Sequence, residues 1–181
     1  MTTPALLRVM YAPLDYIHPH YFPRPAAALT PSVQMAVNHT LIERFALSTS
    51  INFHLQVNDF SQRLVAEWKL VPQVTWLLGC KLARGSLAMG GQLANLPEHA
   101  RRFIELPVIC PACGIEAPVT RDKLELHGAR YLAELRSQLP SALGQRFSLM
   151  FQPESQHPLP GVALNRSLLN FAFDYAKNST H

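Results

Sequence analysis

Cysteine and histidine side chains are the residues of this chain best suited to hold a metal ion or to do thiol chemistry. Cys110 and Cys113 form a C-x-x-C pair, with His99 before it and His127 after it in the sequence. Such a set could bind zinc, and the cysteine pair alone could act as a redox dithiol. A structural zinc site normally shows a second C-x-x-C or an H-x-x-x-H, and the sequence contains neither. The favoured interpretation is two loop cysteines with no metal and no cofactor, and a small zinc- or thiol-dependent enzyme stays as an alternative.

A second candidate group lies near the N-terminus, where His18 and His20 are separated by one proline. On an extended segment both imidazoles could face the same side. A metal site would need a third ligand, however, and only Asp15 is close in sequence. Hydrogen bonds from these histidines to the body of the protein are the simpler interpretation.

The common catalytic motifs are missing from the sequence. There is no G-x-x-x-x-G-K-[ST] phosphate loop and no G-x-S-x-G nucleophile elbow. The glycine-rich stretch at 85–91 lacks the preceding strand that a dinucleotide site requires. The acidic residues show no closely spaced pair for general acid and base catalysis. The sequence therefore predicts that the protein is not an enzyme.

Charge and hydropathy limit the other functional classes. Charged residues make up only 15% of the 181 residues, which suits either a protein whose surface is partly covered by partners or a compact domain rich in Gln, Ser, Asn and His. The net charge is +4, but the cations are spread along the chain, so a basic nucleic-acid-binding regulator is only an alternative. No apolar run approaches the ~20 residues of a spanning helix, and the three cysteines suit a reducing compartment. We therefore expect a cytoplasmic protein without membrane insertion.

The elements that must position these residues are mostly helices. The sequence predicts a mainly α fold, a single compact helical adaptor domain over 1–181, with a short strand pair allowed at 6–11 and 51–57. Its parts are a proline-rich extended arm at 1–31, N-terminal helices at 32–106, an irregular connection at 107–119, and C-terminal helices at 120–181. Apolar spacing and capping residues predict helices that begin at or near Ser32, Asp59, Pro72, Pro97, Thr120, Ser141 and Val162.

The segment at 70–97 combines apolar residues with charges and glycines. Val74, Leu77, Leu78 and Leu82 fall on one helix face and should be buried. Lys81 and Arg84 project away from that stripe, so we expect both in solvent. There they are available to an acidic partner, or they form an ordinary solvated helix face. A glycine inside a helix costs about 1 kcal/mol relative to alanine, so Gly79 indicates that another backbone packs closely there or that the helix bends.

Five segments in order resemble one family of secretion proteins. The resemblance lies in PLDYIHP at 13–19, VNHTLIERFAL at 37–47, LVPQVTWLLGCKLARGSLAMGGQLANLP at 70–97, LGQRFSLMF at 143–151 and FAFDYAK at 171–177. Together they look like the SctK family of type III secretion sorting-platform accessory proteins, in its OrgA/MxiK branch. The likeness spans nearly the whole chain, although the region around Cys110 and Cys113 departs from the family pattern.

The resemblance implies a non-enzymatic cytoplasmic adaptor of the injectisome that supports protein secretion. Such an adaptor bridges the cytosolic domain of an SctD-type inner-membrane ring to the SctQ-type pod protein. It is linked indirectly to the SctL-type stator and the SctN-type ATPase, and it has no known catalytic activity. The candidate partner-interface residues are Tyr16, Ile17, His18, Trp76, Lys81, Arg84, Arg101 and Arg102. A core position is the competing interpretation for Trp68 and Trp76.

Overall fold

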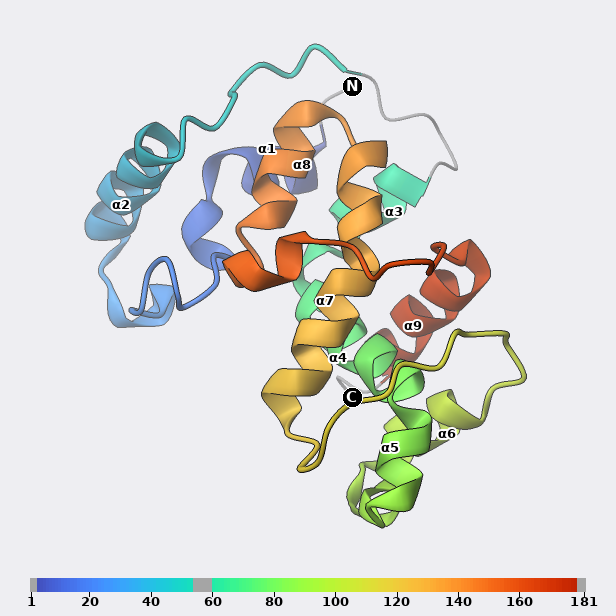
Figure 1. Ribbon diagram of the computed structural model, residues 1–181. Coiled ribbons are helices and arrows are strands. Elements are labelled where there is room, and N and C mark those ends of the chain that lie inside the picture. The colour runs from blue at the N-terminus through green and yellow to red at the C-terminus, as the bar shows by residue number, and fades with distance from the viewer. Residues whose placement is uncertain (1–2, 54–59, 179–181) are drawn as a thin grey trace. The chain divides into compact units, whose positions relative to one another are not determined.

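The computed structural model describes residues 3–53 and 60–178 (Figure 1). In these residues the fold is mainly α-helical, with nine α-helices joined by short 3₁₀ helices and irregular segments, and without a β-strand. The predicted fold class is confirmed. None of the described helices has the length and apolar character needed to cross a membrane.

The chain is organised as two compact units. Unit 1 comprises residues 1–69 and 135–153, and unit 2 comprises residues 70–134 and 154–181. Three described elements contribute residues to both units: η3 (Trp68–Leu70), α7 (Arg121–Gln138) and η5 (Pro153–Gln156). A single adaptor domain over 1–181 stays a prediction.

The remaining elements fall within one unit each. Unit 1 holds α1 (Pro4–Tyr11), η1 (Pro13–Asp15), η2 (Ala26–Ala28), α2 (Pro31–Arg44), α3 (Phe60–Ala66) and α8 (Ser141–Ser148). Unit 2 holds α4 (Val71–Leu82), α5 (Arg84–Met89), η4 (Gln92–Asn95), α6 (Glu98–Glu105) and α9 (Arg166–Asn178).

The N-terminal arm begins with a helix, so the predicted short strand at 6–11 is wrong. The side chain of Thr3 caps α1 by accepting a hydrogen bond from the Leu6 N–H at 3.3 Å. Pro4 follows in the first turn, where a missing N–H costs nothing. Prolines in this arm therefore start a helix as well as interrupt one. The second predicted strand, at 51–57, is irregular over 51–53 and otherwise lies outside the described residues.

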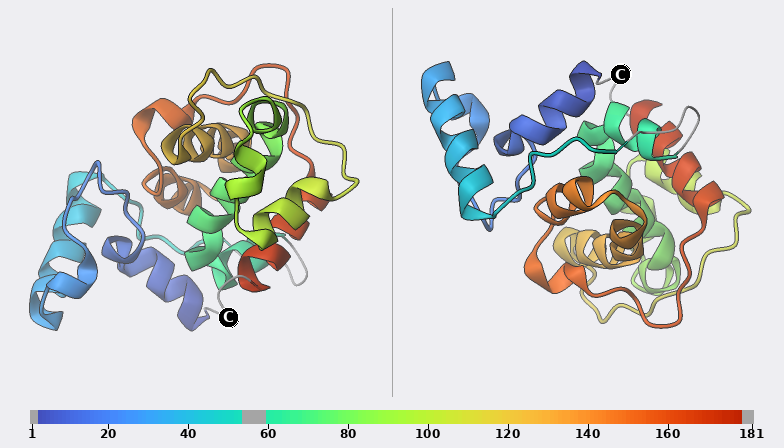
Figure 2. Two further views of the ribbon diagram at one scale, coloured as in Figure 1. Left: turned by 90° about the horizontal axis from the view of Figure 1, so that it is seen from below. Right: turned by 90° about the horizontal axis from the view of Figure 1, so that it is seen from above.

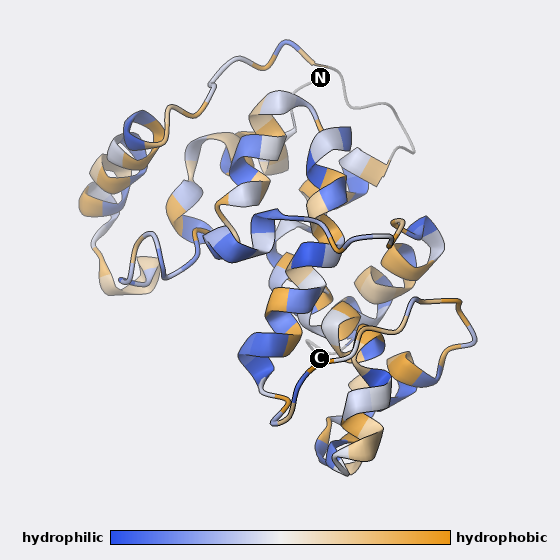
Figure 3. Cartoon of the chain, in the orientation of Figure 1, coloured by the Kyte–Doolittle hydropathy of each residue, from blue (hydrophilic) through white to orange (hydrophobic). Residues whose placement is uncertain are grey.

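Unit 1 is built on α1, which lies beside α3 and α8 (Figure 1). Leu6, Val9 and Met10 form its buried face. Helix α2 lies beside η1 and has apolar residues scattered around it (Figure 3). The predicted helix near Ser32 is confirmed, yet Leu41 is its only fully buried residue and Met35 is 69% exposed. The predicted start of the next helix, Asp59, lies outside the described residues.

Unit 2 is built on α4, which packs against α6 and α9, and α6 in turn lies beside α9 (Figure 2). Pro72 occupies the first turn of α4, as predicted. The whole predicted stripe is buried: Val74, Leu77, Leu78 and Leu82. Lys81 is buried as well, at 6% exposure, so the prediction that its side chain lies in solvent is wrong.

Two glycines let the backbones of α4 and α7 approach each other closely. A Cβ atom on Gly79 would lie 1.9 Å from the carbonyl oxygen of Leu124, and one on Gly128 would lie 1.9 Å from that of Thr75. No side chain fits at either distance. Of the two reasons predicted for Gly79, close packing of another backbone is therefore the correct one.

Capping side chains set the C-terminal helix boundaries. The Thr120 hydroxyl accepts a hydrogen bond from the Lys123 N–H at 3.3 Å, which confirms the predicted cap of α7. The last helix begins at Arg166 rather than near Val162, because the Asn165 side chain accepts hydrogen bonds from the next turn. The irregular connection at 107–119 is confirmed.

Candidate functional site

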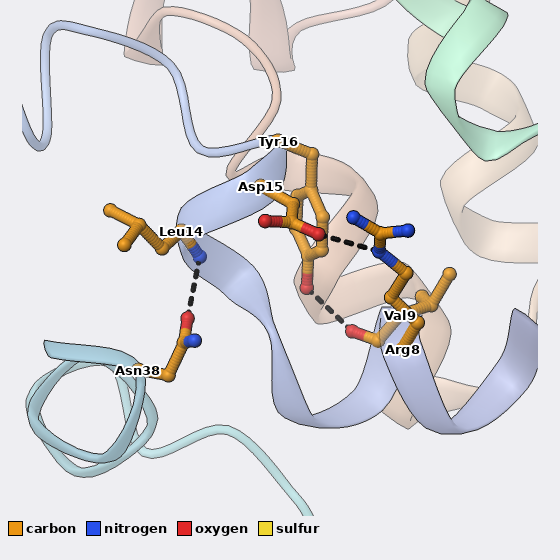
Figure 4. Close-up of polar contacts among 6 residues, drawn as sticks. All are labelled: Arg8, Val9, Leu14, Asp15, Tyr16 and Asn38. Carbon is orange, nitrogen blue, oxygen red and sulfur yellow. Dashed lines mark hydrogen bonds and ion pairs between the residues drawn. The ribbon is translucent and has the colours of Figure 1, made fainter. Parts of the chain in front are cut away.

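The PLDYIHP segment at 13–19 folds back on the helix that precedes it. Asp15 Oδ2 lies 2.6 Å from Arg8 Nε, and the Tyr16 hydroxyl donates to the Val9 carbonyl oxygen at 2.8 Å (Figure 4). Both contacts tie η1 to α1. These contacts fix the direction in which the chain leaves α1.

The same segment also fixes α2. The backbone N–H of Leu14 donates to Asn38 Oδ1 of α2 at 2.9 Å (Figure 4). Leu14 and Ile17 are buried in a small apolar cluster together with Leu41. One turn of η1 thus holds two helices of unit 1 through polar and apolar contacts.

Tyr16 links the segment at 13–19 to the core of unit 1. Its ring meets the Trp68 ring edge to face, with the centroids 5.6 Å apart, and Trp68 meets Phe147 of α8 in the same way at 6.1 Å. Burial raises the pKa of the Tyr16 hydroxyl well above its usual range, although the Arg146 cation works in the opposite direction. The hydroxyl therefore stays protonated and keeps its donor role.

A buried arginine joins three distant segments of unit 1. Arg146 of α8 is completely buried. Its guanidinium donates to the carbonyl oxygen of Met10 from Nε and Nη2 at 3.1 and 2.7 Å. Its Nη1 donates to the carbonyl oxygens of Ser48 and Ala142, each at 2.9 Å. The last turn of α1, the segment after α2 and the start of α8 are thus held by one side chain.

Beside this network unit 1 has a pocket of about 310 Å³ between α1, η1, α3 and η3. Its wall is mainly apolar, from Ala5, Val9, Val65 and Trp68, and Lys69 belongs to the charged part of the lining. The indole Nε1 of Trp68 is buried and has no hydrogen-bond partner among the described residues. The burial of Trp68 agrees with its core interpretation, and no pattern in the sequence predicts the pocket.

Lys81 is the buried cation of unit 2, as Arg146 is in unit 1. Its ammonium donates to the carbonyl oxygens of Ile104 and Leu106, at 2.6 Å each, at the C-terminal end of α6. Burial lowers the pKa of the Lys81 ammonium, and the nearby Cys110 works in the opposite direction. A lysine that finds two backbone acceptors can be buried without a carboxylate, which is why the solvated position was wrongly predicted.

The predicted interface residues divide between buried and exposed positions. In unit 1, Tyr16 and His18 are half-buried, and the His18 N–H donates to the Leu149 carbonyl oxygen at 2.8 Å. In unit 2, Trp76 is buried, with the Arg121 guanidinium 5.4 Å from its ring centroid, so its core interpretation holds. The exposed candidates are Arg84, Arg101 and Arg102, the last paired with Glu98.

The cysteines lie in the irregular connection of unit 2. Burial raises the pKa of the Cys110 thiol to about 11 and also raises that of Cys113. Both groups are therefore thiols near neutral pH in the metal-free protein, which disfavours thiolate chemistry. His127 Nδ1 lies 2.9 Å from the Lys123 carbonyl oxygen. Within residues 3–53 and 60–178, no group of three or more histidine, cysteine, aspartate or glutamate side chains is placed to hold a metal ion.

Sequence reasoning missed the residue that organises unit 1, although a signal was present. Arg146 interrupts an apolar helical pattern made by Ala142, Leu143 and Phe147. A cation inside such a pattern needs acceptors in the core. The pattern alone does not say which carbonyl groups supply them.

Comparison with known proteins gives a consistent result over almost the whole chain. Residues 6–178 match a family described as "Bacterial type III secretion apparatus protein (OrgA_MxiK)". The chain is 32% identical over 173 residues to "Oxygen-regulated invasion protein OrgA" of Salmonella typhimurium, in strains 14028s, SL1344 and LT2 alike. Each alignment covers 94% of this chain and 85% of the relative. No solved structure matches the chain.

Proposed function

Since this chain belongs to the OrgA/MxiK family of bacterial type III secretion apparatus proteins, we propose that it is a non-enzymatic cytoplasmic adaptor of the injectisome. In this proposal it bridges the cytosolic domain of the SctD-type inner-membrane ring to the SctQ-type pod protein. Through the pod it is linked to the SctL-type stator and the SctN-type ATPase. Its contribution to secretion is to hold these parts together.

The observation that carries the proposal is that each unit exposes large apolar side chains. In unit 1, Val33 and Met35 of α2 are exposed, and Leu7 and Tyr11 of α1 are about half exposed. In unit 2, Met89 is 87% exposed. Apolar anchors surrounded by polar groups are typical of protein interfaces. A bridging protein needs two such surfaces, and exposed apolar side chains in both units support this proposal.

The test measures binding to both proposed partners by the full chain. Purified chain is titrated by calorimetry with the SctQ-type pod protein and with the SctD-type ring domain, singly and together. We expect both to bind at the same time. If neither binds, or if they compete for the chain, the bridging role is wrong.

A matched pair of variants assigns the surfaces. Met35→Asp changes unit 1, and Met89→Asp makes the same change in unit 2 at a similarly exposed methionine. Because both side chains are in solvent, we expect little effect on folding. Each variant should weaken binding to one partner and leave the other unchanged. Equal affinity of both variants for both partners would contradict the assignment of one surface to each unit.

A further inference from the structure

The pocket of unit 1 has the composition of a binding site for an apolar side chain. Its apolar wall comes from two helices, with Val9 and Ala5 on α1 and Val65 and Ala66 on α3. Its volume of about 310 Å³ is at the small end of the range for ligand pockets, roughly 300–1,000 Å³. A space of this size suits one or two side chains of a peptide better than a large cofactor.

Trp68 gives the pocket an aromatic wall. Its side chain lines the pocket, and its indole N–H has no acceptor among the described residues. A buried donor without an acceptor is unfavourable, because it has lost its water without gaining a hydrogen bond. The indole nitrogen is itself covered by protein atoms, so a segment that entered the pocket would meet the ring of Trp68 and not its N–H.

The charged part of the lining favours an acidic partner. It consists of Arg8, Asp15 and Lys69. Arg8 and Asp15 neutralise each other, whereas the exposed Lys69 has no carboxylate partner in the part of the chain that the structure describes. The pocket therefore carries one unneutralised positive charge at its edge. An aspartate or glutamate next to the bound apolar side chain would complement it.

From these three features we infer that the pocket binds a short segment of a protein partner, in which a bulky apolar residue is followed or preceded by an acidic one. The apolar side chain fills the space between α1 and α3. It packs against the ring of Trp68, and the carboxylate faces Lys69. The inference rests on the proposed adaptor role for the identity of the protein that carries the segment, but not for the chemistry of the segment.

The first experiment identifies the segment chemistry without assuming a partner. A phage-displayed library of random short peptides is selected on the immobilised full chain, with counter-selection on Ala66→Phe. Ala66 is an exposed residue of α3 that lines the pocket, so the larger side chain should fill the space and leave the fold intact. We expect enrichment of peptides that place an aromatic or large aliphatic residue next to aspartate or glutamate. Failure to enrich any peptide, or enrichment of basic peptides, would overturn the inference.

Two variants with controls then test the pocket on a selected peptide. Ala66→Phe should weaken binding by at least about tenfold, whereas Ala88→Phe, at an exposed helical alanine of unit 2, should have no effect. Lys69→Glu should weaken binding by roughly threefold or more, and the effect should shrink at high salt. Arg24→Glu, an exposed cation of unit 1 outside the pocket lining, is its control. Equal affinities for the wild type and both pocket variants contradict the proposed site.

A spectroscopic measurement reports on the pocket itself. The chain contains two tryptophans, so its ¹H–¹⁵N spectrum should show two indole signals, assigned with Trp68→Phe. Addition of the selected peptide should shift the Trp68 signal and leave that of the buried Trp76 in place. A shift of Trp76 alone would move the binding site to unit 2 and refute the inference.

The outcomes separate this inference from the proposed function. If the chain binds the pod protein and the ring domain, but both pocket variants bind them and the selected peptide normally, the adaptor role stands and the pocket site is wrong. If the chain binds neither protein but selects acidic apolar peptides through the pocket, the site stands and the adaptor role is wrong. Self-association that Ala66→Phe abolishes would identify a second copy as the occupant and overturn the partner segment.

Discussion

Each unit contains a buried cation that donates to backbone carbonyl groups, an arginine in unit 1 and a lysine in unit 2. In unit 1 the guanidinium of Arg146 donates to three backbone carbonyl groups, and in unit 2 the ammonium of Lys81 donates to two. Each cation reaches the end of a helix, α1 in unit 1 and α6 in unit 2, where carbonyl groups have no partner within the helix. Among the described residues neither cation pairs with a carboxylate. Backbone carbonyl groups can thus replace acidic side chains around a buried charge.

The difference lies in what each cation holds together. Arg146 joins segments that are 136 and 98 residues away in the sequence, because its planar fork directs donors to several sides. Lys81 reaches 23 and 25 residues along the chain, to a single helix end. The close packing of unit 2 comes instead from Gly79 and Gly128. We therefore expect the stability of unit 1 to depend on the side chain of Arg146. The stability of unit 2 should depend on Gly79 and Gly128, which carry no side chain.

The largest effect is expected from Arg146→Met. The substitution leaves the buried carbonyl group of Met10 without its donor and removes a donor from the partly buried carbonyl group of Ser48. The free energy of unfolding should therefore fall by about 3–5 kcal/mol. Chemical denaturation, followed by circular dichroism, measures it. Arg146→Lys keeps the charge but lacks the fork and should recover only part of the loss. A fully stable lysine variant would show that charge alone, and not the directed donors, is needed.

Gly128→Ala should come next. The added methyl group would lie 1.9 Å from a backbone oxygen, which cannot rotate away as a side chain can. The helices must separate, and the free energy of unfolding should fall by at least about 1–3 kcal/mol. Gly85→Ala is the control, because it is a helical glycine with nothing within 4 Å of the added atom. That variant should be unchanged or up to about 1 kcal/mol more stable. Equal stability of the two variants would refute close packing as the reason for Gly128.

Lys81→Met tests the weaker of the two cations. The Ile104 carbonyl group loses the Lys81 donor, whereas the Leu106 carbonyl group keeps the Val108 N–H. The protein also no longer has to bury a charge, so the net loss should be only about 1–2 kcal/mol. Thermal melts of Lys81→Met and Arg146→Met side by side measure the difference between the units. A larger loss for Lys81→Met than for Arg146→Met would reverse the comparison.

The smallest effect is expected from Cys110, through pH. Burial raises the pKa of its thiol from the usual 9.0 to about 11, so the folded protein keeps a proton that the unfolded chain loses above pH 9. The stability that this thiol contributes is therefore present below pH 9 and is lost as the pH rises through about 11. Near pH 10 the loss amounts to about 1 kcal/mol. Unfolding curves between neutral pH and pH 10 should be less pH-dependent for Cys110→Ser than for the wild type, and identical slopes would contradict this assignment.

Cys110→Ser also serves the prediction that the two cysteines are dispensable. The double variant Cys110→Ser with Cys113→Ser should fold and support secretion. A structural zinc site would make a far larger contribution to folding than one thiol, on the order of 10 kcal/mol. Collapse of the double variant would therefore revive the zinc alternative.

Local signals determined much of the helical fold. The spacing of Val74, Leu77, Leu78 and Leu82 predicted the buried face of α4, because helical periodicity alone decides which side chains share a face. Pro72 and Thr120 marked helix starts, since a missing N–H and a side-chain acceptor act within one turn. The strand predicted at 6–11 is wrong because Pro4 stands in the first turn of a helix, where its missing N–H costs no hydrogen bond.

The sequence by itself determined most of the helices and the family resemblance, which depend on neighbouring residues and on the order of segments. For Gly79 it left two explanations, and the structure decided for close packing. Only the tertiary structure decided that Lys81 and Arg146 are buried and that Trp68 lines a pocket. The physical reason is that these side chains find their acceptors and neighbours far along the chain. Met10 and Arg146, 136 residues apart, meet only when α1 and α8 have packed together.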